Sequence, residues 1–138
     1  SIFFSDKDSL STIFEKFEIE AIIHLATYYK KYHHPSDIEK IFFVNNILPT
    51  QLLEFAIAAK VKYFINTGTF FEYKRTITPI TETTEYSAFN LYAQSKINFE
   101  NILKFYADKI KSVTFKIFSP FGPKDDTNKI IPALIKAL

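Results

Sequence analysis

Three short apolar runs, separated by longer segments with helical spacing, constrain the fold of this chain more than any other feature. The runs are residues 20–27 (EAIIHLAT), 61–69 (VKYFINTGT) and 113–119 (VTFKIFS). A short, nearly continuous apolar run is typical of a strand buried on both faces of a parallel sheet. Strands that alternate with helices indicate right-handed crossover connections. We therefore expect an α/β fold with three parallel strands, about half of a complete doubly wound sheet.

Four other segments have the spacing of amphipathic helices. They are residues 9–17, 36–60, 91–108 and 130–138. Ser36 and Asp37 are expected to cap the second of them, and Pro49 inside it predicts a bend or break near Leu48. Residues 28–35 and 70–90 have no clear period, so we expect irregular structure there.

Composition narrows the possible partners. The net charge of +2 provides no field that would favour nucleic acid, and the 138 residues contain no Cys that could form a disulfide or ligate a metal. No apolar run reaches the length of a membrane span, which is about 18 residues. His33 and His34 lie in a polar loop without metal-ligand spacing, so no metal site is expected. We expect a cytoplasmic protein that binds neither nucleic acid nor membrane.

The carboxyl ends of parallel strands are where ligands bind in open α/β sheets. The second run ends in Thr67-Gly68-Thr69, which places two hydroxyls beside a glycine that permits close approach. A helix cap or a turn explains the same residues equally well. His24, at the end of the first run, is interpreted as a core histidine in preference to a catalytic one.

A Tyr and a Lys stand four residues apart in Tyr92-Ala93-Gln94-Ser95-Lys96, on one face of the third helix. With 8 Tyr in the chain, roughly one such pair is expected by chance, so the pair alone has no weight. Its position matters more, because it opens a helix directly before the third strand. A neighbouring ammonium lowers the pKa of a phenol, which would make Tyr92 an acid/base near neutral pH. Together with Thr69, the pair predicts a carbonyl-sized reductase site.

These segments together resemble a known family. Asp6–Leu10 (DKDSL), IIHLAT, NNILPTQLLEFA, FINTGT, NLYAQSK and FKIFSPFGP occur in the order and spacing of the extended short-chain dehydrogenases/reductases, also called NAD-dependent epimerases/dehydratases. NLYAQSK and KIFSPFGPKD look most like the branch of the CDP-abequose and CDP-paratose synthases. That resemblance implies a Rossmann-like domain, a nucleotide-sugar substrate, NAD or NADP as cofactor, and a place in O-antigen sugar biosynthesis.

The resemblance also implies roles for individual residues. Tyr92 would be the acid/base, Lys96 would tune it and hold the nicotinamide ribose, and Thr69 would hydrogen-bond the substrate's C4 oxygen. Ser119 stands where many epimerases carry Asn, at a position that contacts substrate. The remaining cofactor positions that the resemblance implies are Asp6, Leu25, Ala26, Thr27, Asn46, Thr67 and Phe118.

Two departures from the family pattern bear on mechanism. Phe70 and Phe71 follow Thr69 where the 4,6-dehydratase branch has an Asp-Glu pair, so we expect keto reduction, or epimerisation as the alternative, and not dehydration. The chain has two glycines, and neither opens a helix as a pyrophosphate-binding turn does. We therefore expect residues 1–138 to form a single partial NAD(P)-binding domain, inactive alone, that lacks the glycine-rich first half and the C-terminal substrate portion.

Two further expectations concern association. The helix over 91–108 is apolar on more than one side, which indicates a buried helix or a partner. Family members dimerise through this helix and the one before the second strand, so the resemblance implies a homodimer through residues 37–60 and 91–108. A non-catalytic domain of the same ancestry, which binds a nucleotide or a protein without turnover, is the alternative from another functional class.

Overall fold

The computed structural model describes residues 7–75, 79–123, 125–127 and 129–137. In chain order its elements are α1 Lys7–Lys16, β1 Ala21–His24, the 3-10 helix η1 Pro35–Asp37, α2 Ile38–Phe42, the π-helix η2 Phe43–Ile47, α3 Leu48–Ala58, β2 Tyr63–Thr69, the 3-10 helix η3 Phe70–Glu72, α4 Leu91–Phe105, β3 Lys111–Ile117 and α5 Ile130–Ala137.

The three strands form one parallel sheet in the order β1-β2-β3. His24 pairs with Asn66 at the carboxyl end of β1, and Thr69 pairs with Ile117 at the end of β2. The predicted α/β class, with three parallel strands and flanking helices, is confirmed. The segments after these strands therefore leave the sheet at the same edge.

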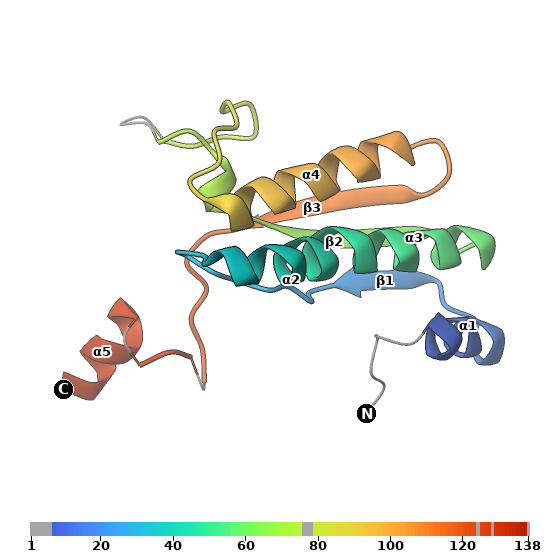
Figure 1. Ribbon diagram of the computed structural model, residues 1–138, viewed down its shortest axis with the longest axis horizontal. Helices are drawn as coiled ribbons and strands as arrows, with labels where there is room; N and C mark the ends of the chain where they lie inside the picture. Colours follow the sequence, from blue (N-terminus) through green and yellow to red (C-terminus); the bar gives the residue numbers. More distant parts are fainter. Residues whose placement is uncertain (1–6, 76–78, 124, 128, 138) are drawn as a thin grey trace.

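Helices cover one face of the sheet, where α2, α3 and α4 lie side by side (Figure 1). The core between them and the sheet is built around Leu53, Phe64 and Phe99, none of which is exposed to solvent. Burial of each such side chain contributes roughly 2–3 kcal/mol. The opposite face carries exposed apolar residues, among them Ile23 and Phe115, so in this chain the strands are covered on one face.

The long helical segment before β2 is interrupted where the sequence predicted a break. A π-helical turn, η2, ends at Ile47, and Pro49 lies in the first turn of α3. Proline has no N–H to donate to the preceding turn, and a π-turn is one way to absorb that loss. Asp37, one of the two predicted caps, is the N-cap residue of α2 but makes no side-chain capping bond there, and His34 caps η1 in a capping box with Asp37.

Helical residues Pro35–Ala58 pass a test of length and apolar composition for a membrane span. Core helices meet the same test, and Ile41, Leu53 and Ala56 of this stretch are buried in the domain. Two adjacent amides, Asn45 and Asn46, are buried in the middle of it. Of its most apolar 18 residues 33% are buried, so the stretch packs one side against the domain.

Most of the remaining differences between the predicted and the observed elements lie at the ends of strands. β1 stops at His24 instead of Thr27, because the chain there turns towards η2, where Asn45 bonds the backbone of Tyr28. β3 begins at Lys111, two residues before the predicted start. Within 70–90 the described residues contain η3 and one isolated bridge, between Tyr73 and Tyr86.

Candidate active site

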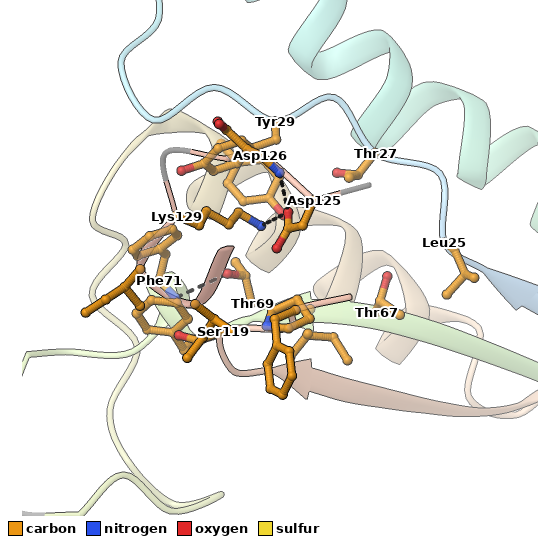
Figure 2. Close-up of a pocket in the computed structure, with 18 of the residues that line it drawn as sticks. Leu25, Thr27, Tyr29, Thr67, Thr69, Phe71, Ser119, Asp125, Asp126 and Lys129 are labelled. Carbon is orange, nitrogen blue, oxygen red and sulfur yellow. Dashed lines mark hydrogen bonds and ion pairs between the residues drawn. The ribbon is translucent and has the colours of Figure 1, made fainter. Parts of the chain in front are cut away.

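A cavity of about 880 Å³ lies at the carboxyl edge of the sheet (Figure 2). This volume is within the range of small-molecule and cofactor sites, which is roughly 300–1,000 Å³. Segments that follow all three strands contribute to its wall, together with the start of α4. Its described lining includes Leu25, Thr27, Tyr29, Thr67, Gly68, Thr69, Phe70, Phe71, Tyr92, Ile117, Ser119, Pro120, Phe121, Asp125, Asp126, Lys129, Ile130, Ile131 and Pro132.

Thr69 ends β2 and begins η3, so it is both a helix cap and part of the cavity wall. Its hydroxyl oxygen accepts a hydrogen bond from the Phe71 N–H at 3.4 Å, and its own N–H donates to Glu72 Oε1 at 2.6 Å. This is a capping box, in which side chain and backbone satisfy each other. Because the hydroxyl oxygen already accepts, its proton is available for a ligand in the cavity.

Of the strand-end residues predicted to bind cofactor, Leu25, Thr27 and Thr67 also line the cavity (Figure 2). The Thr67 hydroxyl donates to the carbonyl of His24 at 3.1 Å, which fastens β2 to the end of β1. Thr67 and Thr69 of β2 and Thr27 in the segment after β1 therefore line the cavity together, with the apolar Leu25 beside Thr27 and Thr67.

Tyr92 lies in the first turn of α4, a helix that Asn90 caps by accepting from the Ala93 N–H at 2.8 Å. Its side chain is 8% exposed and meets the ring of Tyr29 edge-on, at 4.9 Å between centroids. Burial raises the pKa of Tyr92 above its ordinary value, and a hydrogen bond with Thr27 offsets this in part. The expectation that Lys96 lowers this pKa is therefore wrong for this arrangement, because desolvation of the phenolate dominates.

Lys96 lies one helical turn after Tyr92 and is 2% exposed. Burial lowers the pKa of its ammonium to about 8, although the carboxylate of Glu72 opposes the shift. A buried amine with a pKa this close to neutrality is typical of functional sites, although structural ion pairs produce such shifts as well. Because Lys96 is buried and is not among the described lining residues, it lies behind the cavity wall.

The two adjacent asparagines have different surroundings. Asn46, the predicted cofactor position, donates from its amide to the carbonyl of Ser95 at 2.9 Å. Asn45 connects more groups, since its oxygen accepts from the Tyr28 N–H and the Thr27 hydroxyl, and its amide donates to the Tyr28 carbonyl and the Ser95 hydroxyl. The π-turn η2 therefore ties the loop after β1 to α4, and the tie is made by Asn45.

His24 is a buried side chain at the end of β1, as the core interpretation predicted. Its Nδ1 lies 3.5 Å from Asn66 Oδ1, and its Nε2 is buried without a protein hydrogen-bond partner in the described structure. Burial lowers the pKa of His24 to about 4, and the charge of Lys96 acts in the same direction. The imidazole is therefore neutral at physiological pH.

The remaining predicted positions are placed as follows. Ser119 lines the cavity with a positive φ of 41°, a conformation that non-glycine residues seldom adopt. Ala26 and Phe118 are outside the described lining, and the Phe118 ring instead lies 5.7 Å from that of Phe70. Asp6 lies outside the described residues, so its predicted adenine contact remains a prediction.

Sequence reasoning overlooked three charged residues beneath the Thr69 turn: Glu72, Glu100 and Lys116. The Lys116 ammonium forms ion pairs with both carboxylates. The Thr-x-x-Glu pattern of a capping box, present in Thr69–Glu72, is a local signal that could have pointed to Glu72. No local pattern indicates that Lys116 pairs with Glu72 and Glu100, which are 44 and 16 residues away in the sequence.

The carboxyl edge of the parallel sheet therefore carries Thr69 and Tyr92 in one cavity wall, with Lys96 one helical turn behind Tyr92. Residues 2–138 match the family model of the NAD dependent epimerase/dehydratase family, and the chain belongs to that family.

Two curated relatives are CDP-abequose synthases. The one from Salmonella muenchen is 34% identical over 124 residues, which are 87% of this chain and 39% of the relative. The one from Salmonella typhimurium is 32% identical over 137 residues, which are 95% of this chain and 42% of the relative. The chain therefore spans about two fifths of the length of these proteins.

Solved structures agree on the fold. Pal from Bacillus thuringiensis superposes with a TM-score of 0.85 at 25% identity, covering 96% of this chain and 44% of that one. A UDP-glucose 4-epimerase from Thermus thermophilus, solved in complex with NAD, gives a TM-score of 0.79 at 21% identity, covering 98% and 45%. The Rossmann-like prediction is confirmed by these similarities.

Proposed function

We propose that this chain is the catalytic part of an NAD(P)-dependent nucleotide-sugar oxidoreductase that reduces a carbonyl at C4 of a CDP-linked dideoxyhexose. One observation carries the proposal: Thr69 and Tyr92 line the same cavity, and Lys96 lies one helical turn behind Tyr92. These three groups come from β2 and α4, which pack against each other. The similarity to two CDP-abequose synthases supports the choice of substrate class.

The chemistry assigned to these residues is proton transfer and orientation. The Thr69 hydroxyl donates a hydrogen bond to the carbonyl oxygen and holds it in place. Tyr92 supplies the proton that the oxygen takes up as the carbonyl becomes an alcohol. Burial keeps the pKa of Tyr92 raised, so the phenol is protonated at neutral pH and is ready to act as an acid. Lys96 adds a positive charge next to the phenolate that remains.

The cavity fits the nicotinamide half of a dinucleotide. Apolar Leu25 and Ile117 can cover an uncharged ring, and the hydroxyls of Thr27 and Thr67 can bond a ribose or an amide. A reduced nicotinamide would supply the hydride for the carbonyl carbon. Lys96, protonated below its pKa of about 8, lies behind this wall and would place its positive charge near the bound ribose.

Phe70 and Phe71 support reduction or epimerisation over dehydration. Both line the cavity immediately after Thr69, and neither side chain can transfer a proton. Elimination of water needs an acid and a base beside the sugar, and these two positions offer none. Phe70 and Phe71 give this part of the wall an apolar character that suits a deoxygenated sugar carbon.

Epimerisation at C4 is the second candidate, because the same hydride chemistry serves both reactions. A UDP-glucose 4-epimerase from Streptococcus mutans is 32% identical over 127 residues, which are 88% of this chain and 38% of that protein. The two candidates differ in stoichiometry. A reductase consumes one reduced cofactor for each product, whereas an epimerase returns its cofactor unchanged.

The test is made on the gene product that contains this chain, with a CDP-4-keto-3,6-dideoxy sugar and reduced NAD or NADP. Stoichiometric loss of reduced-nicotinamide absorbance supports the reductase, and interconversion of C4 epimers without net loss supports the epimerase. Binding without either reaction would instead indicate a non-catalytic domain. The preferred cofactor is the one with the higher kcat/KM.

Tyr92→Phe is expected to lower kcat by about 10²–10⁴-fold, the usual contribution of a general acid. Tyr29→Phe is the matched control, because Tyr29 lines the same cavity and packs against Tyr92. It should keep kcat within a few-fold of the starting protein. Equal losses in the two variants would refute the role assigned to Tyr92.

We also propose that the protein forms a homodimer through residues 37–60 and 91–108 and acts in the cytoplasm, in the assembly of O-antigen sugars. Exposed apolar side chains on these helices, Phe43, Ile47 and Phe105, support the dimer. The match to CDP-abequose synthases supports the biosynthetic role.

A further inference from the structure

A compact cluster of buried charges lies directly beneath the Thr69 turn. Lys116, on β3, forms ion pairs with Glu72 of η3 and Glu100 of α4. The Glu72 side chain is 0% exposed, and those of Lys116 and Glu100 are 11% and 15% exposed. The rings of Tyr86 and Tyr73 stand 4.6 and 5.9 Å from the Lys116 ammonium, and the Tyr86 hydroxyl donates to Glu100 at 3.0 Å.

The cluster explains why β2 carries a glycine beside Thr69. A Cβ added at Gly68 would lie 2.7 Å from Lys116 Cδ and 2.8 Å from Glu72 Oε1. Such separations are far inside van der Waals contact, so a larger residue would displace the ion pair. The close approach that a glycine permits is therefore used here by the Glu72–Lys116 pair.

Glu72 also connects to the residues of the candidate site. Its Oε1 accepts the Thr69 N–H at 2.6 Å, which fixes the turn that presents the Thr69 hydroxyl. Its negative charge favours the protonated form of Lys96, against the effect of burial. The charges of Glu72 and Glu100 balance those of Lys116 and Lys96, so the buried group as a whole is neutral when all four are ionised.

Other titratable groups face this cluster as well. Tyr92 on α4 feels the charge of Glu72, which raises its pKa after the larger effect of burial. His24 on β1 feels the charge of Lys96 but is itself neutral above pH of about 4. Among the described residues, Glu72 is therefore the negative group that acts on both members of the Tyr92–Lys96 pair.

We propose that Glu72 is a positioning residue of the oxidoreductase site: it holds the Thr69 turn from below and keeps Lys96 charged, while Lys116 and Glu100 hold it in place. This inference rests on the proposed function, and it adds a residue that acts through Thr69 and Lys96 without touching substrate. Loss of the Glu72 charge leaves an excess positive charge in the cluster, and Lys96 then releases its proton at a lower pH.

The first test needs no turnover, so it separates this inference from the proposed function. Lys96 has a folded-state pKa of about 8, below the ordinary value of 10.5, so the unfolded protein binds more protons in this window. The free energy of unfolding therefore rises with pH above about 8. Glu72→Gln, whose amide oxygen can still accept the Thr69 N–H, should start this rise about one pH unit lower.

Three controls isolate the charge of Glu72. Glu100→Gln removes the other carboxylate on Lys116 but not the one bonded to Thr69. It should shift the onset, which is the pH at which the free energy of unfolding begins to rise, less than half as far as Glu72→Gln does. In a Lys96→Met background the shift caused by Glu72→Gln should disappear. The double variant Glu72→Gln/Lys116→Met restores neutrality and should return the onset to that of the starting protein.

The second test is the pH profile of kcat for reduction of the CDP-4-keto sugar. Glu72→Gln should lower kcat about tenfold at pH 8, with KM for the sugar changed less than threefold, and shift the alkaline limb in the direction seen in unfolding. The inference is overturned if Glu72→Gln folds and changes neither the onset of the rise in unfolding free energy nor the pH profile of kcat. It is also overturned if Glu100→Gln shifts both as far as Glu72→Gln does. If Glu72→Gln does not fold, the double variant decides: a restored onset supports the inference and a shifted one overturns it. An unfolding shift without any reductase activity would overturn the proposed function alone.

Discussion

Asn45 should contribute more to stability than its neighbour Asn46, although both are buried amides in the same π-turn. The Asn45 side chain is 1% exposed and makes four hydrogen bonds, to Thr27, to both backbone groups of Tyr28 and to Ser95. In Asn45→Ala, water can replace the bond to the exposed Thr27 hydroxyl, but the other three are lost within the protein. At about 1 kcal/mol each, we expect Asn45→Ala to lower the free energy of unfolding by about 3 kcal/mol.

Asn46→Ala is the matched control. It removes one hydrogen bond, to the Ser95 carbonyl at 2.9 Å, and also removes an amide oxygen that has no partner in the described structure. We expect a loss of about 1 kcal/mol. For 138 residues the entropy of unfolding is about 0.3 kcal/mol/K, so the expected decreases in Tm are about 10 °C for Asn45→Ala and about 3 °C for Asn46→Ala.

Urea unfolding followed by circular dichroism measures both losses, and thermal scans check the decreases in Tm. Equal losses, or a larger loss for Asn46→Ala, would refute the idea that Asn45 joins the β1 loop to α4.

Three other perturbations have defined outcomes. The pKa of His24 is about 4 in the fold against 6.5 ordinarily, so the unfolded protein binds more protons between these pH values. The free energy of unfolding should therefore fall by up to about 3 kcal/mol as pH drops from 6.5 to 4. His24→Gln should flatten this part of the pH profile measured by urea unfolding. Ser119→Asn should raise the free energy of unfolding by about 0.5–1 kcal/mol, because Asn tolerates the φ of 41° better than Ser; a destabilised variant would contradict strain at this position. Replacement of the exposed Ile47 and Phe105 by Lys should convert the proposed homodimer to monomer in light scattering, and an unchanged mass would place the interface elsewhere.

The sequence predicted the fold class because the signals for it are local. Each apolar run and each helical pattern shows its period within about ten residues, so β2 and α4 were located to within two or three residues of their observed ends. The break before Pro49 was predictable for the same reason, since the missing N–H is a property of the residue itself. The placement of Thr69 and Tyr92 at one edge followed from the strand order and the rule for parallel sheets.

Tertiary structure decided the properties that depend on contacts between distant segments. The pKa of Tyr92 is raised and not lowered, because the packing of α4 on the sheet removes the phenol from water. Asn45 was indistinguishable from Asn46 until the fold brought it to Tyr28 and Ser95, 17 and 50 residues away. In the same way, Glu72 met Lys116 across 44 residues. Local sequence patterns are enough to show which residues carry reactive groups and which elements present them. Burial and charge pairing set the pKa values of those groups, and both exist only once the chain has folded.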